Sequence, residues 1–500
     1  MARTMTSREK LAQLIMPGWR EERPGTPAAR RRLERLIGRC PAGGILIFGH
    51  GGERDVTRFV RDLPRPSGRR MLVSMDLEDG LGERCAEVPR LPNPMAVGAS
   101  GDPRLAFRHG RSVGLQARRA GIDIAFAPVS DVNTNPLNPI INIRSFGGDP
   151  RAVSRMVAAW TRGCQSAGVL ACAKHFPGHG DTARDSHLML PTGKGELAPF
   201  RAAVRAGVGT IMTAHVIFPG FGEKRKPATL SRKIMTGVLR RRLGFRGLIV
   251  TDGFAMKGIA GHYGEGRAAV IALNAGCDVI LAPRDPGALL DHLERAYRRG
   301  ELPAALVDAA VARVEAARRR AGRVRPRPAG EAEAYVRASR REVARRAVTV
   351  LGRTLPGCLG RALWIVVDDD TRRSSAGEFV TLLRRRHPEA KAIVLRDGRR
   401  PPALPAGRFD AAVVSVFAKM IYNKGRIRIP EGLMRAAKRA ASRADRAVGI
   451  LYGSPYVAND LPKSWALLAA FSDAPDSLVA GLDALEGRLR PTGRLPVSLG

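Results

Sequence analysis

The chain has 500 residues, of which 44% are hydrophobic, and it carries a formal net charge of +38. This length exceeds one ordinary domain and suits a barrel of about 300 residues followed by a smaller domain. The positive charge favours anionic partners, but aromatic residues make up only 5% of the chain. Since base stacking needs aromatic side chains, nucleic-acid binding is not the expected main role.

The cysteines and the N-terminus indicate the compartment. The six cysteines are scattered singly, without a C-x-x-C pair, which indicates reduced thiols rather than a disulfide framework or a zinc site. The residues before Arg20 lack an apolar core of signal-peptide length, and no run of about 18 apolar residues occurs. We therefore expect a cytoplasmic protein without a membrane span.

Short apolar runs alternate with amphipathic helices up to about residue 320, which is typical of a parallel β/α fold. Helices are expected at Ser7–Met16, Pro150–Ala167 and Arg232–Leu243. The expected strands are Gly43–Phe48, Met71–Met75, Ile122–Val129, Val169–Ala173, Thr210–Thr213, Gly247–Thr251 and Asp278–Leu281. This set predicts an α/β fold, a (β/α)8 TIM-like barrel with one strand missed, whose functional residues lie at the C-terminal strand ends.

Acidic residues follow the strand at Met71–Met75. Asp76, Glu78 and Asp79 come directly after it, and Arg84 lies shortly beyond. An ionised carboxylate only accepts hydrogen bonds, so Asp76 could hold two ligand hydroxyl groups. The alternative is a loop of exposed acids.

The segment Ser130–Pro150 is rich in Asn and Pro, which set turns. Asp131 is expected in an Asx turn more than in ligand binding. Arg144 lies in the sequence I-R-S-F-G. Turn scaffolding is the expected role of Asn133, Asn135 and Asn138.

The stretch Lys174–His187, KHFPGHGDTARDSH, carries the densest set of reactive side chains. Gly178 and Gly180 give its backbone freedom at an entropic cost, so the loop contributes little core. Asp185 and His187 are two residues apart and can face the same side, where the carboxylate orients the imidazole. Such an imidazole can exchange a proton near neutral pH. The alternative is a loop whose polar side chains bond its own backbone.

Two further strand ends carry polar residues. Thr210–Phe218 places His215 at one, where a structural role is as plausible as ligand contact. Gly247–Met256, GLIVTDGFAM, delivers Asp252 to the other. The alternative for Asp252 is a helix N-cap, because the residues after it could open a helix.

Pro and Gly at Arg323–Gly330 mark a domain boundary. Residues 1–325 are expected to form the barrel, 326–348 a helical linker, and 349–500 a smaller three-layer αβα sandwich with a largely parallel sheet. Its expected strands are Ala362–Val367, Ala392–Leu395, Ala411–Phe417 and Ala447–Leu451. Because no comparable reactive set occurs there, this domain is expected to pack against the barrel or shape access to it.

KHFPGHG followed by DSH resembles the signature of glycoside hydrolase family 3, of the β-N-acetylhexosaminidase type, in its two-domain form. The resemblance implies that Asp252 is the nucleophile and that His187 is the acid/base, oriented by Asp185. Asp79 departs from the family pattern, which more often has Gly there. The substrate-binding residues that it implies are Asp76, Arg84, Arg144, Lys174 and His175.

The sequence therefore predicts an exo-acting retaining β-N-acetylglucosaminidase that cleaves terminal β-linked GlcNAc by double displacement, without a cofactor. The resemblance and the expected cytoplasmic location favour peptidoglycan-derived GlcNAc–anhydro-MurNAc fragments over chitin-type oligosaccharides. Inorganic phosphate could replace water as the acceptor, because a neutral imidazole repels an anion less than a carboxylate does.

Three alternatives stay open. One is another family-3 β-glycosidase, such as a β-glucosidase, and one is a basic, non-enzymatic glycan- or nucleic-acid-binding protein. The third is a divalent metal site, which is not favoured because a barrel-mouth site would draw ligands from several strands. Its ligands would be His175, His179, Asp181, Asp185 and His187.

Overall fold

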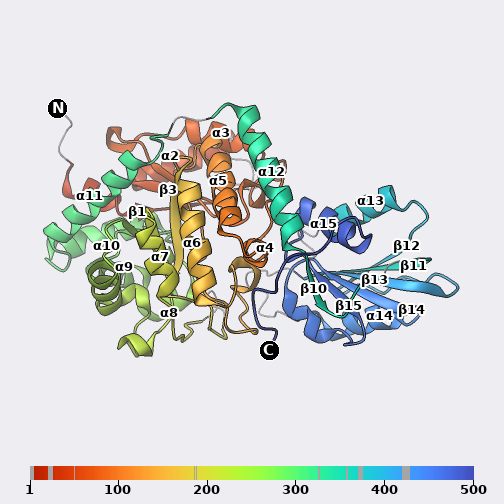
Figure 1. Cartoon of the computed structure of the whole chain (residues 1–500). Coiled ribbons are helices and arrows are strands. Elements are labelled where there is room, and N and C mark those ends of the chain that lie inside the picture. Colours follow the sequence, from red (N-terminus) through yellow and green to blue (C-terminus); the bar gives the residue numbers. More distant parts are fainter. Residues whose placement is uncertain are drawn as a thin grey trace.

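The structure is a computed structural model that describes residues 5–20, 26–49, 51–184, 186, 189–324, 327–355, 359–369, 375–418 and 428–500. Within this part of the chain, a barrel and a second α/β unit are joined by the long helix α12 (Ala329–Ala347), as Figure 1 shows. Five of the six cysteines lie in the described residues, and all five are free and buried.

A parallel sheet closes on itself to form the barrel. Its strand order is β1-β9-β8-β7-β6-β5-β4-β3-β2. β1 (Ile15–Met16) pairs with β9, β2 (Gly18–Trp19) pairs with β3, and only Pro17 separates them, so one extended segment joins both ends of the sheet. The other strands are β3 (Gly44–Ile47), β4 (Leu72–Met75), β5 (Ile124–Ala125), β6 (Leu170–Phe176), β7 (Thr210–Thr213), β8 (Leu248–Gly253) and β9 (Val279–Leu281). The predicted barrel is confirmed.

The strand missed from the sequence is the segment of β1 and β2. The helix expected at Ser7–Met16 is shorter, since α1 (Ser7–Ala12) ends before this strand segment begins. Ile15 and Met16 are buried and pair with Ile280 and Leu281. Because this pairing joins distant parts of the chain, the local helical pattern could not indicate it.

Two other barrel elements differ in form from the expectation. The strand expected at Ile122–Val129 is regular only over β5, although Val129 makes an isolated bridge to Lys174. The helix expected at Arg232–Leu243 is a π-helix over Lys233–Arg242. The residues after β5 therefore leave the sheet early and form loop around the barrel mouth.

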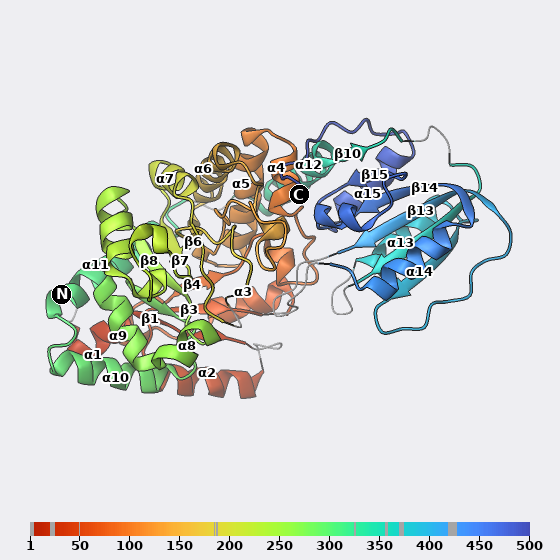
Figure 2. The same ribbon diagram turned by 90° about the horizontal axis from the view of Figure 1, so that it is seen from below.

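Helices surround the barrel (Figures 1 and 2). None of the described helices is long and apolar enough to cross a membrane. The helices that surround the barrel after α1 are α2 (Pro27–Arg39), α3 (Glu53–Arg61), α4 (Pro94–Ala99), α5 (Pro103–Arg119), α6 (Pro150–Gln165), α7 (Ala198–Arg205), α8 (Lys257–Tyr263), α9 (Glu265–Ala275), α10 (Pro286–Arg298) and α11 (Ala304–Arg320).

The second unit is the expected three-layer sandwich. Its sheet has the order β10-β15-β14-β13-β11-β12, and only the β10–β15 pair is antiparallel. α13 and α15 lie on one side of the sheet and α14 on the other (Figure 1). The sequence missed β10 and β15. The elements are β10 (Thr349–Gly352), β11 (Ala362–Asp368), α13 (Ala376–Arg386), β12 (Lys391–Arg396), β13 (Phe409–Phe417), α14 (Glu431–Ala441), β14 (Ala444–Leu451), β15 (Ala466–Ala469) and α15 (Pro475–Leu485).

A buried histidine fastens the α5–α6 pair beside the barrel. Gly110 on α5 lets the backbone of Trp160 on α6 approach so closely that a Cβ would clash with the Trp160 carbonyl. The Trp160 indole N–H donates to His109 Nδ1 at 2.9 Å, so His109 Nε2 carries the proton and donates to Pro92 O, also at 2.9 Å. Burial lowers the pKa of His109 to about 4.

This histidine predicts acid sensitivity. Its pKa is about 4 when folded and about 6.5 when unfolded, so its contribution to stability is complete above pH 6.5 and is lost as pH falls towards 4. We expect His109→Gln, which keeps an acceptor and a donor, to reduce the slope of unfolding free energy against pH in this window by up to about 1.4 kcal/mol per pH unit.

Urea unfolding between pH 4.5 and 7.5 measures the slope. His262→Gln, at an exposed histidine on α8, controls for the substitution itself. Parallel curves for the parent and His109→Gln would show that His109 is not the titrating group.

Candidate active site

A cavity of about 1070 Å³ opens at the C-terminal ends of the barrel strands. It brings together residues from distant parts of the sequence. The expected site residues among those lining it are Asp76, Arg84, Arg144, Lys174, His175 and Asp252. Asp185 and His187 lie outside the described residues, but Ser186 between them lines the same cavity.

Asp76 and Lys174 form the first ion pair of the site. Asp76 follows β4, Lys174 is on β6, and the lysine Nζ lies 2.8 Å from Asp76 Oδ1. Arg84 approaches the other carboxylate oxygen at 3.3 Å. Burial alone would raise the pKa of Asp76, but Lys174 and Arg84 outweigh it and hold this pKa below its usual value. Asp76 is therefore an ionised acceptor at neutral pH.

Glu78 is a site residue that the sequence did not single out. Its carboxylate accepts two hydrogen bonds from Arg144, both at 2.7 Å, and lies 2.7 Å from Lys174 Nζ. Burial opposes its ionisation, yet Arg144 and Lys174 outweigh that cost and lower the pKa of Glu78. The available signal was spacing, because residues two apart on an extended backbone face the same side and Glu78 is two residues after Asp76.

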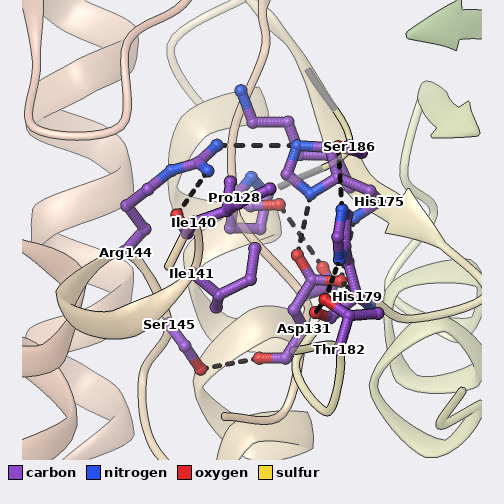
Figure 3. Close-up of polar contacts among 12 residues, drawn as sticks. Pro128, Asp131, Ile140, Ile141, Arg144, Ser145, His175, His179, Thr182 and Ser186 are labelled. Carbon is purple, nitrogen blue, oxygen red and sulfur yellow. Dashed lines mark hydrogen bonds and ion pairs between the residues drawn. The ribbon is translucent and has the colours of Figure 1, made fainter. Parts of the chain in front are cut away.

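Asp131 holds the two histidines of the KHFPGH segment (Figure 3). Its carboxylate accepts from the backbone N–H groups of His175, at 3.1 Å, and His179, at 2.7 Å. Its other oxygen lies 2.8 Å from His175 Nδ1, and Arg144 contacts His175 Nε2 at 3.5 Å. Since arginine only donates, His175 Nε2 accepts and Nδ1–H donates to Asp131. The expected Asx turn is wrong, because Asp131 reaches across to β6.

His179 connects this cluster to the loop of the expected acid/base. Thr182 donates its hydroxyl to the His179 carbonyl, so His179 Nδ1–H donates to Thr182 Oγ1 at 2.6 Å. His179 Nε2 then accepts from the Ser186 hydroxyl at 2.9 Å (Figure 3). Burial lowers the pKa of His179 to about 4, so the ring is neutral at physiological pH. The hydrogen bond to His179 thus holds Ser186 in place.

Asp252 lies near the end of β8, as expected. The Gly253 N–H donates to its Oδ1 at 2.7 Å. The alternative N-cap role is wrong, since α8 begins at Lys257 with Met256 as its N-cap. His215 is fully buried, bonds Thr229 at 2.8 Å and approaches the Gly253 carbonyl at 3.3 Å, so it supports the backbone beside Asp252.

Asp79, which departs from the expected pattern, faces the second unit of the protein. Arg90 lies 3.9 Å from Asp79 and forms a 2.7 Å ion pair with Asp473 of that unit. Burial raises the pKa of Glu83 well above its usual value, and the charge of Asp79 adds to this shift against the opposing effect of Arg84. Asp79 therefore belongs to the contact between the two units.

The three asparagines and Asn142 are divided between turns and this contact. The side-chain carbonyls of Asn135 and Asn138 accept from backbone N–H groups two residues on, at 2.9 Å each, which confirms their scaffolding role. The Asn133 amide instead donates to the Tyr456 hydroxyl at 2.6 Å. Asn142 donates to Ser454 at 3.0 Å, so the second unit packs against the loop that carries Arg144.

In the part of the chain that the structure describes, no three His, Cys, Asp or Glu side chains are grouped to hold a metal ion. The ring nitrogens of His175 and His179 bond Asp131, Thr182 and Ser186.

Known proteins are similar to this chain in sequence and in fold. The chain is 34% identical to a β-hexosaminidase of Neisseria meningitidis over 283 residues, which are 52% of this chain and 76% of the relative. It is also 34% identical to β-hexosaminidase A of Pseudoalteromonas piscicida over 286 residues, 50% of this chain and 47% of the relative. The chain thus spans about half the length of that relative.

A solved structure is similar over both units. The glycoside hydrolase family 3 β-N-acetylglucosaminidase from Paenibacillus sp. superposes with a TM-score of 0.83 at 28% identity and covers 99% of each chain. Residues 6–317 match the family model of the glycosyl hydrolase family 3 N-terminal domain. The chain therefore belongs to glycoside hydrolase family 3.

Proposed function

We propose that this protein is an exo-acting, retaining β-N-acetylglucosaminidase. The observation that carries the proposal is that Asp252 shares one cavity with the Asp76, Lys174 and Arg144 cluster. A carboxylate beside a buried set of donors and acceptors matches the needs of glycoside cleavage, which are a nucleophile and a grip on sugar hydroxyls. The names of the relatives support GlcNAc as the sugar.

In the proposed mechanism, Asp252 attacks the anomeric carbon while the His187 imidazolium, oriented by Asp185, protonates the departing oxygen. The glycosyl–enzyme is then hydrolysed by water, which the now neutral His187 deprotonates. Asp76 accepts from sugar hydroxyls, and Arg84, Arg144, Lys174 and His175 complete the grip. Glu78 acts through Arg144 and Lys174 by fixing both cations in place.

The proposed substrates are peptidoglycan-derived GlcNAc fragments met in the cytoplasm. The β-hexosaminidase relatives, which match about half of this chain, support the sugar, and the KHFPGHG and DSH motifs suggest the fragment type. Phosphorolysis stays a prediction, and product analysis in raised inorganic phosphate tests it. A sugar 1-phosphate among the products would establish it, whereas free sugar alone would count against it.

The nucleophile has a direct test. Asp252→Asn is expected to lower kcat on 4-nitrophenyl β-GlcNAc at least about a thousandfold, because the amide cannot form the glycosyl–enzyme. Asp285→Asn is the control, since Asp285 lines the same cavity as a helix cap and Asn also caps helices well. Labelling with a 5-fluoro GlcNAc fluoride should place the sugar on the peptide that contains Asp252.

A label on any other residue would overturn the assignment. Faster cleavage of 4-nitrophenyl β-glucoside than of the GlcNAc compound would favour the β-glucosidase alternative.

The acid role of His187 predicts a dependence on the leaving group. His187→Gln should lower kcat/KM at least about a hundredfold for a 4-methoxyphenyl β-GlcNAc, whose phenolate needs protonation. The loss should stay below about tenfold for a 2,4-dinitrophenyl β-GlcNAc, which departs unaided. Asp185→Asn should follow the same pattern with smaller losses, and equal losses on both substrates would contradict acid catalysis.

Glu78 predicts a large effect on stability. Glu78→Gln leaves two buried cations short of a negative charge, so we expect the free energy of unfolding to fall by about 3 kcal/mol. The control is Glu34→Gln, which breaks the exposed pair with Arg30 at 3.2 Å and should cost less than about 0.5 kcal/mol. Chemical denaturation measures both, and similar losses would show that the buried pairing contributes nothing special.

A further inference from the structure

The cavity has a second half that the proposed catalytic residues do not use. It is exposed, and arginines from three segments line it. We call these residues the arginine wall: Arg20, Arg32, Arg35, Arg39 and Arg284. The carboxylate among the described lining residues on this side is Asp285, whereas Asp76 and Asp252 lie at the sugar end.

Helix α2 explains why the wall faces the cavity. Arg32, Arg35 and Arg39 are spaced i, i+3 and i+7, so they share one face of the helix. Ala29, Leu33 and Ile37 form the buried face of the same helix. α2 contacts α10, which follows β9, and extends alongside the barrel (Figure 2). The stripe therefore borders the opening.

Local contacts fix several wall residues. The Arg20 guanidinium stacks over the Phe48 ring at 3.8 Å from its centroid. Arg39 lies 3.5 Å from Asp285. Arg284 reaches the carbonyl of Ala255 at 3.5 Å, and Ala255 is three residues after Asp252. The wall thus begins beside the proposed nucleophile and continues outwards.

The direction of the wall matches the direction of the leaving group. Side chains that would hold the non-reducing sugar are buried, with Lys174 only 3% and Arg144 only 7% exposed. A sugar seated there, with its anomeric carbon at Asp252, leaves the exposed half of the cavity for the aglycone. A cleft in which one charge predominates also concentrates oppositely charged ligands.

We infer that the arginine wall is an aglycone subsite selective for an anionic group, a carboxylate or a phosphate. Guanidinium groups pair with both anions through two parallel hydrogen bonds. The inference rests on the proposed function and adds to it the charge of the preferred leaving group.

Two pairs of disaccharides test it at fixed sugar and linkage, each at low and at high salt. GlcNAc-β-1,4-MurNAc is compared with its methyl ester, in which a methyl group replaces the carboxylate charge. Chitobiose 6-phosphate, with the phosphate on the reducing sugar, is compared with chitobiose. At low salt we expect kcat/KM for at least one anionic member to exceed that of its neutral partner about tenfold or more. Both comparisons are repeated in about 0.5 M salt, which is well above physiological ionic strength. Screening should there reduce the anionic-to-neutral ratio of kcat/KM.

Variants assign the preference to the wall. The triple substitution Arg32→Gln, Arg35→Gln, Arg284→Gln should bring the anionic-to-neutral ratio to about one. The matched control Arg31→Gln, Arg54→Gln, Arg58→Gln removes the same charge from exposed helix positions outside the cavity lining and should keep the parent ratio. Thermal unfolding checks that both triple variants are folded.

The outcomes separate the two proposals. A preference for the carboxylate or for the phosphate supports the wall and identifies its ligand. The subsite is overturned if the parent cleaves the anionic and neutral members with equal kcat/KM, or if both triple variants lose the anionic preference equally. Neither result contradicts the proposed glycosidase activity. Failure to cleave any of the four disaccharides, together with the nitrophenyl substrate, overturns the proposed function itself.

Discussion

A buried lysine held between two carboxylates is the constraint on which the site depends. The Lys174 ammonium lies within 2.8 Å of both Asp76 and Glu78, and its side chain is 3% exposed. A buried charge of this kind is tolerated only when it is paired and hydrogen-bonded. The end of β6 must therefore stay beside the residues that follow β4, and this requirement fixes one side of the barrel mouth.

The same pairing extends into the irregular loops. Glu78 fixes Arg144 on the loop after β5, and Arg144 reaches His175. Asp131 then accepts two backbone N–H groups of the glycine-bearing segment, so a buried carboxylate helps to order a backbone that is also closely packed against its neighbours. Loops with little core of their own can in this way hold side chains at defined positions above a rigid sheet.

The sequence predicted the barrel because seven buried strands alternate with helices, a pattern that depends on local periodicity. It missed Ile15–Trp19, because closure pairs this segment with residues at the far end of the barrel. At the site, strand-end position led to Asp76 and Asp252, which both line the cavity, and their roles stay predictions. The sequence could not predict which cation each acid would pair with, because three acids follow β4. Only the fold shows that Glu78 pairs with Arg144 while Asp79 faces Arg90.

The division of charge within the cavity explains how a strongly basic protein can hold a neutral sugar. At the buried end, the formal charges of Asp76, Glu78 and Asp252 offset those of Lys174, Arg84 and Arg144, and the pairs are close enough to satisfy one another. A neutral ring then meets directed hydrogen bonds and little net field. The excess of arginine is displaced to the exposed half, where solvent lowers the cost of like charges standing together. Recognition of the sugar therefore rests on directed hydrogen bonds, whereas attraction of an anionic aglycone rests on the positive charge of the arginine wall.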